Sequence, residues 1–291
     1  MKKPLTAKQV DRVMPYVLLI PAMTLFTLFS FWPFAKSFYL AMTVTNKKGE
    51  AVAWAGLSNF TRLFAQPKFL QVLKNTFLFA ALVAVFTFAL AIILALLCVE
   101  QKRFSRIYQT MYAIPMAIAS APAAALFLFI FKQSGVLDML LGTSYPWLTS
   151  SKFAIYSVAA ATVWLSIGSS FLFLLVGFRA VPETLLESAR IDGAGKMTRI
   201  FRIMFPIASP QIFFVVFLNI TNAFKAFGEI RLLTAGGPAN STETLVYAIY
   251  KEAILNGRFE TACCYSIILF FAIFAVTRVQ LLTENRVIHY D

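Results

Sequence analysis

Charged residues are scarce in this sequence. They make up 13% of its 291 residues, whereas 59% are hydrophobic. Soluble chains of this size carry about twice that density of charge. Because the apolar residues are concentrated in runs, the composition excludes an ordinary soluble domain and indicates a membrane protein. The net charge of +13 does not indicate nucleic-acid binding, since the lysines and arginines lie at the ends of apolar runs rather than along one exposed stripe.

Histidine and cysteine are nearly absent. The single histidine, His289, stands close to the C-terminal end, so imidazole catalysis and histidine-based metal sites are almost excluded. The three cysteines provide no disulfide framework. We expect Cys98, Cys263 and Cys264 to be small apolar packing residues, because each lies in or at the end of an apolar run.

A nucleotide-binding motif is also missing. Gly195-Lys196 resembles the end of a phosphate-binding loop, but Arg190 stands where the first glycine belongs and Met197 where the magnesium-binding hydroxyl belongs. A dinucleotide-binding fingerprint fails too, because Thr198 replaces its third glycine. We therefore expect no cofactor in this chain. Any energy for its function must come from another polypeptide or from an ion gradient.

Six apolar segments can cross a bilayer, which takes roughly 20 helical residues. The fifth and sixth are short and could continue past Lys225 and Arg278. The first follows basic residues, as in a signal peptide, but its apolar stretch is too long for one, so we interpret it as a retained span. The predicted spans are Val13–Ala35, Asn75–Val99, Ile107–Phe131, Phe153–Phe178, Ile207–Phe224 and Ala262–Thr277.

The distribution of lysine and arginine predicts the orientation. With the N-terminus in the cytoplasm, the inner connections are short and dense in basic residues, and the outer ones are longer. This predicts an all-α polytopic membrane protein with six transmembrane helices and both termini in the cytoplasm. The expected organisation is a cytoplasmic tail over 1–12, a single transmembrane domain over 13–284 with a cytoplasmic helical hairpin at 181–206, and a cytoplasmic tail over 285–291.

The segment 181–206 is the only long polar stretch between two apolar ones. Pro182 suits the first turn of a helix, and Gly193 falls where a C-terminal cap would end it. A second helix follows and is expected to close at Pro206. Periodicity alone leaves two interpretations open, a docking element for a partner protein and an interfacial hairpin on lipid headgroups. The two apolar faces comprise Leu185, Leu186 and Ala189, and then Met197, Ile200, Phe201 and Met204.

Residue identity favours the docking element. Glu187-Ser188-Ala189, Asp192-Gly193-Ala194 and then Phe201, Ile203 and Pro206 resemble the cytoplasmic signature of ABC-importer permease subunits. Ser188 and Phe205 replace the family's alanine and leucine and keep size or apolar character. The resemblance implies a coupling helix that seats in a groove of an ATP-hydrolysing subunit. The implied coupling residues are Glu187, Ser188, Ala189, Asp192, Gly193, Ala194, Phe201 and Pro206.

A second block, residues 224–250, resembles the permeases of maltose-type and glycerol-phosphate-type importers. Gly228 and Arg231 replace the commonest family residues there, an aspartate and an aromatic. The resemblance covers nearly the whole chain and implies a non-enzymatic permease subunit of the bacterial inner membrane for a carbohydrate or a polyol such as glycerol 3-phosphate. The implied partners are a second related permease, two ATPase subunits that hold ATP and magnesium, and an extracytoplasmic solute-binding protein.

Polar residues near the fifth span are the candidates for a substrate pathway. Asn219 and Asn222 lie three apart on one helical face, where they hydrogen-bond to another helix or bind substrate hydroxyls. Lys225 and Glu229 are four apart and can pair on a helix face, as a solvated helix end or as part of the pathway. Ser169 in the fourth span either packs closely or contributes a polar lining.

Two other functions are compatible with the residues. An ion-driven secondary carrier would use Lys225, Glu229 and Arg231 and would move solute without ATP. A non-transporting membrane scaffold would use the hairpin only to recruit a partner.

Overall fold

The computed structural model describes the backbone of residues 7–100 and 105–287 and the side chains of 14–100 and 105–284. This part of the chain is helical apart from its connecting loops and one short β-hairpin. It contains five helices long and apolar enough to cross a membrane, or six if one bent pair counts as a single span. The ends of the two predicted tails, 1–6 and 288–291 with His289, lie outside the described residues.

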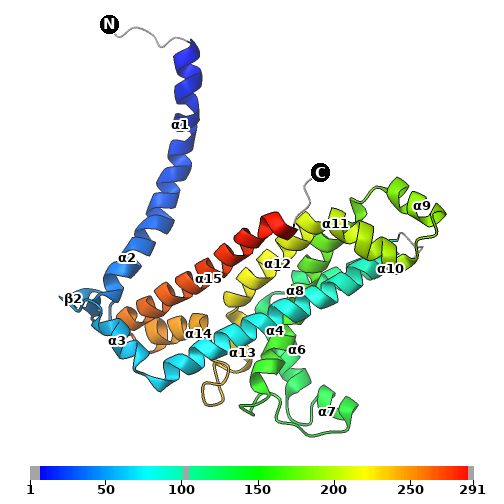
Figure 1. Cartoon of the computed structure of the whole chain (residues 1–291). Coiled ribbons are helices and arrows are strands. Elements are labelled where there is room, and N and C mark those ends of the chain that lie inside the picture. The colour runs from blue at the N-terminus through cyan, green and yellow to red at the C-terminus, as the bar shows by residue number, and fades with distance from the viewer. Residues whose placement is uncertain (1–6, 101–104, 288–291) are drawn as a thin grey trace.

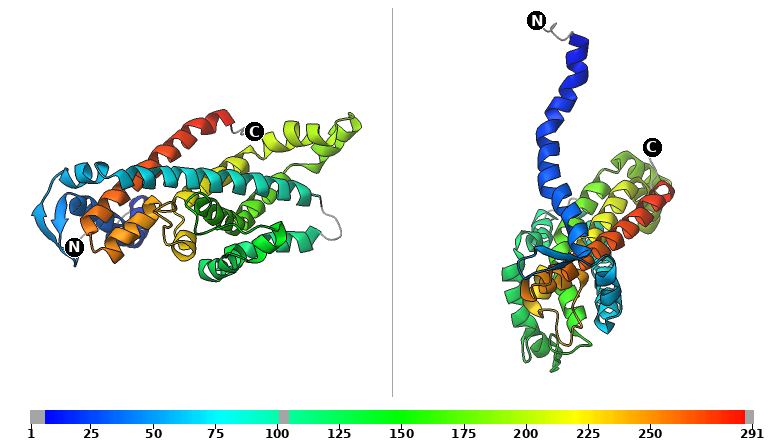
Figure 2. Two further views of the ribbon diagram at one scale, coloured as in Figure 1. Left: turned by 90° about the horizontal axis from the view of Figure 1, so that it is seen from below. Right: turned by 90° about the vertical axis from the view of Figure 1, so that its left-hand side faces the viewer.

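One long helix begins the described chain. It runs through α1 (Ala7–Phe26), the π-helical turn η1 (Thr27–Phe31) and α2 (Trp32–Ala41). The most apolar stretch of this helix has no buried residue. α1 stands away from the other elements (Figures 1 and 2), whereas α2 packs on α15, with the rings of Phe34 and Phe270 4.9 Å apart. The first predicted span thus lies within one continuous helix. An apolar helix exposed all round belongs in lipid or against another protein.

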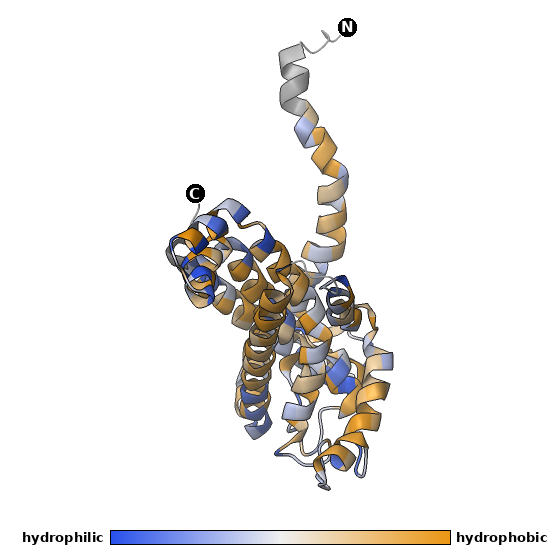
Figure 3. Cartoon of the chain, turned by 90° about the vertical axis from the view of Figure 1, so that its right-hand side faces the viewer, coloured by the Kyte–Doolittle hydropathy of each residue, from blue (hydrophilic) through white to orange (hydrophobic). Residues whose placement is uncertain are grey.

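Four long helices form the body of the fold. Apolar residues dominate their length and hydrophilic ones gather toward their ends (Figure 3). They match the predicted second, fourth, fifth and sixth spans, and the last continues past Arg278 as expected. Beyond the fifth, α13 (Gly228–Leu233) resumes after a short break, so that 209–233 forms one candidate span. The four are α4 (Pro67–Cys98), α8 (Ala154–Arg179), α12 (Ser209–Phe224) and α15 (Phe259–Val287).

The predicted third span, 107–131, is a broken pair of helices. α5 (Ser105–Ala113) leads into the 3₁₀ turn η2 (Ile114–Ala117), and α6 (Ser120–Phe131) then leaves at an angle of 102°. Pro115 lies in that turn, where it cannot donate to a helical hydrogen bond. The turn packs tightly on α8, because a Cβ at Gly168 would lie 3.1 Å from the carbonyl oxygen of Ala113.

Short elements occupy the opposite end of the bundle from α9 (Figure 1). Two are the antiparallel strands β1 (Thr43–Thr45) and β2 (Ala51–Trp54), with Thr43 opposite Trp54. The fold is therefore not strictly all-α, since β-branched residues around the turn at Gly49 (φ +79°) form this hairpin. The others are the helices α3 (Ser58–Phe64), α7 (Val136–Leu141) and α14 (Leu245–Tyr250) and the π-helical η4 (Lys251–Leu255).

A buried carboxylate fixes the loop between α13 and α14. Glu243 is fully buried, and its oxygens lie 2.7 Å from Nζ of Lys68 and 2.8 Å from Nζ of Lys251. Burial alone would lower the pKa of Lys251, but the hydrogen bond to Glu243 and its charge outweigh burial and raise that pKa. Asn75 on α4 donates to the carbonyl oxygens of Asn240 and Glu243. The loop is thus bound to the start of α4.

Candidate functional site

The predicted hairpin is present and begins with α9 (Glu183–Ile191), which follows Pro182. Two backbone hydrogen bonds close this helix: Gly193 N–H donates to Arg190 O at 3.1 Å, and Ala194 N–H donates to Ala189 O at 2.8 Å. Together they form a Schellman motif, which requires a left-handed residue at the position of Gly193. Its φ is +79°, so the predicted cap is confirmed.

The second arm is a helix of mixed type. α10 (Lys196–Arg199) passes into the π-helical η3 (Ile200–Met204) and then into α11 (Phe205–Ile207). The arm ends one residue past Pro206, close to the predicted end, but the π-helical turn was not predicted. We refer to residues 183–207 as the α9–α11 hairpin; it projects beyond the ends of α4 and α8 (Figure 1).

The base of the α9–α11 hairpin is packed and its tip is exposed. Val181, Ile200 and Met204 are buried in one cluster with residues of α4, α8 and α12. In contrast, Ile191, Met197 and Phe201 are 87%, 67% and 62% exposed. The apolar face predicted for the second arm therefore divides: one side packs onto the bundle and the other faces outward. Exposed apolar residues gathered on a hairpin are typical of a docking surface.

The predicted coupling residues surround this surface. Glu187 and Asp192 are exposed, and the hydroxyl of exposed Ser188 donates to Thr184 O at 2.9 Å. Ala189 and Ala194 are half-buried at the joint between the arms. An added Cβ at Gly193 would meet nothing within 4 Å, so only its backbone conformation requires glycine. Phe201 faces outward on the second arm and Pro206 is half-buried.

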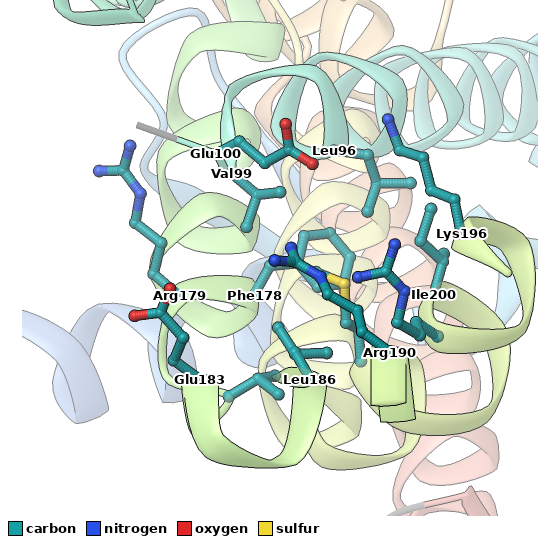
Figure 4. A pocket seen from close by; sticks show the side chains of 13 residues that line it. Leu96, Val99, Glu100, Phe178, Arg179, Glu183, Leu186, Arg190, Lys196 and Ile200 are labelled. Carbon is teal, nitrogen blue, oxygen red and sulfur yellow. The ribbon is translucent and has the colours of Figure 1, made fainter. Parts of the chain in front are cut away.

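A cavity of about 540 Å³ lies between the α9–α11 hairpin and the ends of α4 and α8 (Figure 4). Leu186 and Ile200 belong to its apolar lining, and Arg179 fixes one edge by donating from Nη2 to Cys98 O at 3.1 Å. The sequence alone does not predict this cavity, because its charged residues come from the ends of α4 and α8 and from both arms of the hairpin, and no motif connects them. Those charged residues are Glu100, Arg179, Glu183, Arg190, Lys196 and Arg199.

The structure separates the predicted pathway residues. Asn219 is buried, and its Oδ1 accepts a hydrogen bond of 2.8 Å from the hydroxyl of Ser170, which joins α12 to α8. Asn222 is exposed, so the two asparagines do not act as a pair. Ser169 is exposed next to Ser170 and donates to Ser166 O at 3.2 Å.

Lys225 and Glu229 do not share one helix face, which corrects the predicted pairing. α12 ends at Phe224 and α13 begins at Gly228, so the chain bends between the two charges. The ion pairs of the described side chains do not include Lys225 with Glu229. Lys225 is exposed and Glu229 is half-buried.

An aromatic clamp holds Arg231. Its guanidinium carbon lies 4.7 Å from the ring centre of Tyr250 and 5.8 Å from that of Phe227. Arg231 also lines a cavity of about 640 Å³ with Lys132 and Trp147. The sequence does not predict that these residues lie close together, because their contact depends on the packing of α6, α13 and α14 against one another.

Comparison with known proteins identifies the family. Residues 88–289 match the family described as "Binding-protein-dependent transport system inner membrane component". The chain belongs to this family. The resemblance to importer permeases is thus confirmed, and this inner membrane component is a transport subunit with several membrane-spanning helices.

Relatives match this transport component over nearly its whole length. The sn-glycerol-3-phosphate transport system permease protein UgpA of Agrobacterium fabrum is 34% identical over 285 residues, which are 96% of this chain and 97% of the relative. The protein of the same name from Pectobacterium atrosepticum is 34% identical over 283 residues, 96% of each chain.

Solved structures share its fold. A chain from a bacterial ABC transporter involved in the import of the acidic polysaccharide alginate matches with a TM-score of 0.84 at 23% identity, covering 96% of this chain and 98% of that one. A second match, with a TM-score of 0.83 at 22% identity, comes from the alginate transporter in complex with a periplasmic protein bound to an alginate pentasaccharide. It covers 96% of each chain.

Proposed function

We propose that this chain is one permease subunit of an ATP-driven importer for a small carbohydrate or polyol such as glycerol 3-phosphate, and that the α9–α11 hairpin couples it to a separate ATPase. Six spans, counting α5–α6 as one broken span, would then form half of the translocation pathway. Both termini and the hairpin lie in the cytoplasm in this proposal, as the positive-inside rule requires.

The main support for the coupling role is that the α9–α11 hairpin has an exposed tip and a base that is buried against the bundle. Ile191, Met197 and Phe201 face outward beside Glu187, which suits a surface that a partner covers. Ile200 and Met204 are buried against α4, α8 and α12. Because packed cores transmit displacement as rigid bodies, movement of a partner at the tip would rotate these spans.

The ATPase is assigned to a partner because the chain has no complete nucleotide-binding loop of its own. Glu187 would dock on that partner through hydrogen bonds or charge, and Ala189 and Ala194 would permit close approach. Asp192 and Ser188 offer further polar groups at the tip, and two ATPase subunits would serve two permeases. An extracytoplasmic solute-binding protein would deliver the substrate at the opposite end.

The first helix supports a second permease as partner. Its most apolar stretch is exposed all round and it leans away from the bundle (Figure 2). In a subunit that acts alone this helix would contact only lipid. In a pair of related permeases it would pack on the neighbouring subunit, which would bury the face that this chain leaves uncovered.

The substrate class rests on the relatives and on the polar groups of the fifth span. The two UgpA relatives are named for sn-glycerol 3-phosphate. Asn222 and Lys225 are exposed at the end of α12, and polar groups exposed on a span face a pathway or a partner rather than lipid. Asn219 and Ser169 form hydrogen bonds within this chain, with Ser170 and Ser166, and Glu229 is half-buried, so we assign these three residues to the support of the pathway.

Replacement of Glu187 by lysine tests the coupling role. Glu187 is exposed and forms no part of the core, so the variant should fold normally but lose most substrate uptake and copurification of the ATPase. The matched control is Glu50→Lys, which makes the same charge reversal at an exposed site in the β-hairpin turn. Unchanged uptake and assembly in Glu187→Lys would remove the coupling role. Uptake by the chain alone, driven by an ion gradient without ATP, would instead support a secondary carrier.

A further inference from the structure

The cavity beneath the α9–α11 hairpin has an excess of positive charge. Four basic side chains line it, against two acidic ones. Arg190 and Arg199, from opposite arms of the hairpin, both line it, and Figure 4 shows the Arg190 side chain extending into this region. Lys196 borders the same opening. Like charges that converge in a partly enclosed space repel one another unless an anion lies between them.

The two arginines lack carboxylate partners within the described side chains. None of the ion pairs found there includes Arg190 or Arg199. The Nε atom of Arg199 is buried and has no hydrogen-bond partner among the described residues. A buried donor without an acceptor is costly, and a shift of this guanidinium toward ligand oxygens in the cavity would satisfy it.

The rest of the lining is apolar. Val99 at the end of α4 and Phe178 at the end of α8 belong to this apolar lining, together with side chains from the hairpin base. The cavity thus combines a basic rim with an apolar interior at the level where two spans end. That level is where the headgroups of a bilayer lie. The remaining apolar lining residues are Leu96, Val181, Leu186, Ile200 and Met204.

We propose that this cavity binds a phosphate group through Arg190 and Arg199, supplied by an anionic phospholipid of the adjacent leaflet or by free inorganic phosphate. Guanidinium groups match the geometry of phosphate oxygens with two parallel hydrogen bonds each. Basic pockets between helices at the cytoplasmic side are known to hold lipid headgroups. The proposal rests on the proposed function for the side of the membrane, and it links anion binding to the position of the two hairpin arms.

The test uses the full-length chain copurified with its transporter subunits. Retention of phosphatidylglycerol and of phosphatidylcholine is compared by native mass spectrometry for the wild type, Arg190→Gln and Arg199→Gln. Arg202→Gln is the matched control, since Arg202 is exposed on the same arm and does not line the cavity. We expect the wild type and the control to retain phosphatidylglycerol preferentially, and each cavity variant to bind it about tenfold more weakly.

A second experiment distinguishes the two sources of phosphate. In nanodiscs of phosphatidylcholine alone, inorganic phosphate is titrated and its binding followed by ³¹P NMR. Binding that the cavity variants lose and Arg202→Gln keeps would assign the site to free phosphate. A wild-type protein that prefers neither phosphatidylglycerol nor inorganic phosphate would overturn the proposal, and so would cavity variants that bind both probes as the wild type does.

These measurements involve neither ATP nor transport, so they separate the anion site from the coupling role. The Glu187→Lys variant should lose coupling and still bind phosphatidylglycerol or phosphate at the wild-type level. Normal substrate uptake by Glu187→Lys would refute the coupling role. Loss of anion binding in Arg199→Gln would still support the anion site in that case.

Discussion

Gly193 determines the shape of the α9–α11 hairpin through its backbone alone. Its φ of +79° is the left-handed conformation, and an added Cβ would have no neighbour within 4 Å. A β-branched residue there is strained by about 1–2 kcal/mol or more, whereas asparagine adopts this conformation readily. We expect Gly193→Val to weaken ATPase copurification and uptake, and Gly193→Asn to retain both. Equal losses in the two variants would show that the side-chain space, not the backbone, matters here.

Glu243 is the residue on which the loop between α13 and α14 depends. It is fully buried between Lys68 and Lys251, whose side chains are 27% and 29% exposed. Removing its charge leaves Lys251 without an ion pair and leaves Lys68 only the longer contact of 3.7 Å with Glu252. We expect Glu243→Gln to lower the free energy of unfolding by about 2 kcal/mol, below the ~3–5 kcal/mol of a fully buried pair, because both lysines keep contact with water. Thermal unfolding in detergent measures this, and the exposed Glu50→Gln should leave the midpoint unchanged.

At the scale of single elements, Asp138 ties α7 to the loop that follows it. Its carboxylate accepts hydrogen bonds from Trp147 Nε1 at 2.8 Å, Ser134 N at 2.8 Å and Tyr145 N at 3.2 Å. Burial alone would raise the pKa of Asp138, but these three hydrogen bonds outweigh burial and leave that pKa below its usual value of 3.8.

The direction of this pKa shift predicts an acid-sensitive loop. A carboxyl whose pKa is lower in the folded chain contributes stability that is complete above its unfolded pKa of about 3.9 and is lost as the pH falls through the lower folded value. With Trp32, Trp54 and Trp164 replaced by phenylalanine, Trp147 fluorescence should change in that acidic range. In Asp138→Asn this transition should be absent and the loop loosened already at neutral pH. An identical acid transition in Asp138→Asn would assign it to another group.

The elements also show where the sequence was informative. Continuous apolar runs predicted α4, α8, α12 and α15 because a bilayer demands helices of that length and composition. Pro115 and Pro122 favour a kink in the third span, but hydropathy does not record the packing of η2 on Gly168 that accompanies the break between α5 and α6. The cap at Gly193 was predictable because it depends on neighbouring residues. The basic cavity was not, because Arg179, Arg190 and Arg199 meet only after three elements fold together.

At the scale of the whole molecule, the arrangement of its two ends decides how it could work. The start of α1, the end of α15 and the α9–α11 hairpin lie toward one side of the bundle, and the β-hairpin, α3 and α7 lie toward the other (Figure 1). If the hairpin is the docking surface for a cytoplasmic ATPase, all elements of its side must be cytoplasmic. The orientation of one turn therefore determines that of the entire chain.

Two single cysteines test this orientation. In a background with Cys98, Cys263 and Cys264 replaced by alanine, Lys48→Cys places a thiol in the β-hairpin turn and Asp192→Cys places one in the α9–α11 hairpin; both positions are exposed. A membrane-impermeant maleimide applied to spheroplasts should label Lys48→Cys strongly and leave Asp192→Cys unlabelled until the membrane is permeabilised. The charge distribution supports this result, because anionic lipids and the insertion machinery retain basic connections inside. Labelling of Asp192→Cys from outside would place the hairpin beyond the reach of any ATP-consuming partner, and the proposed coupling would then be untenable.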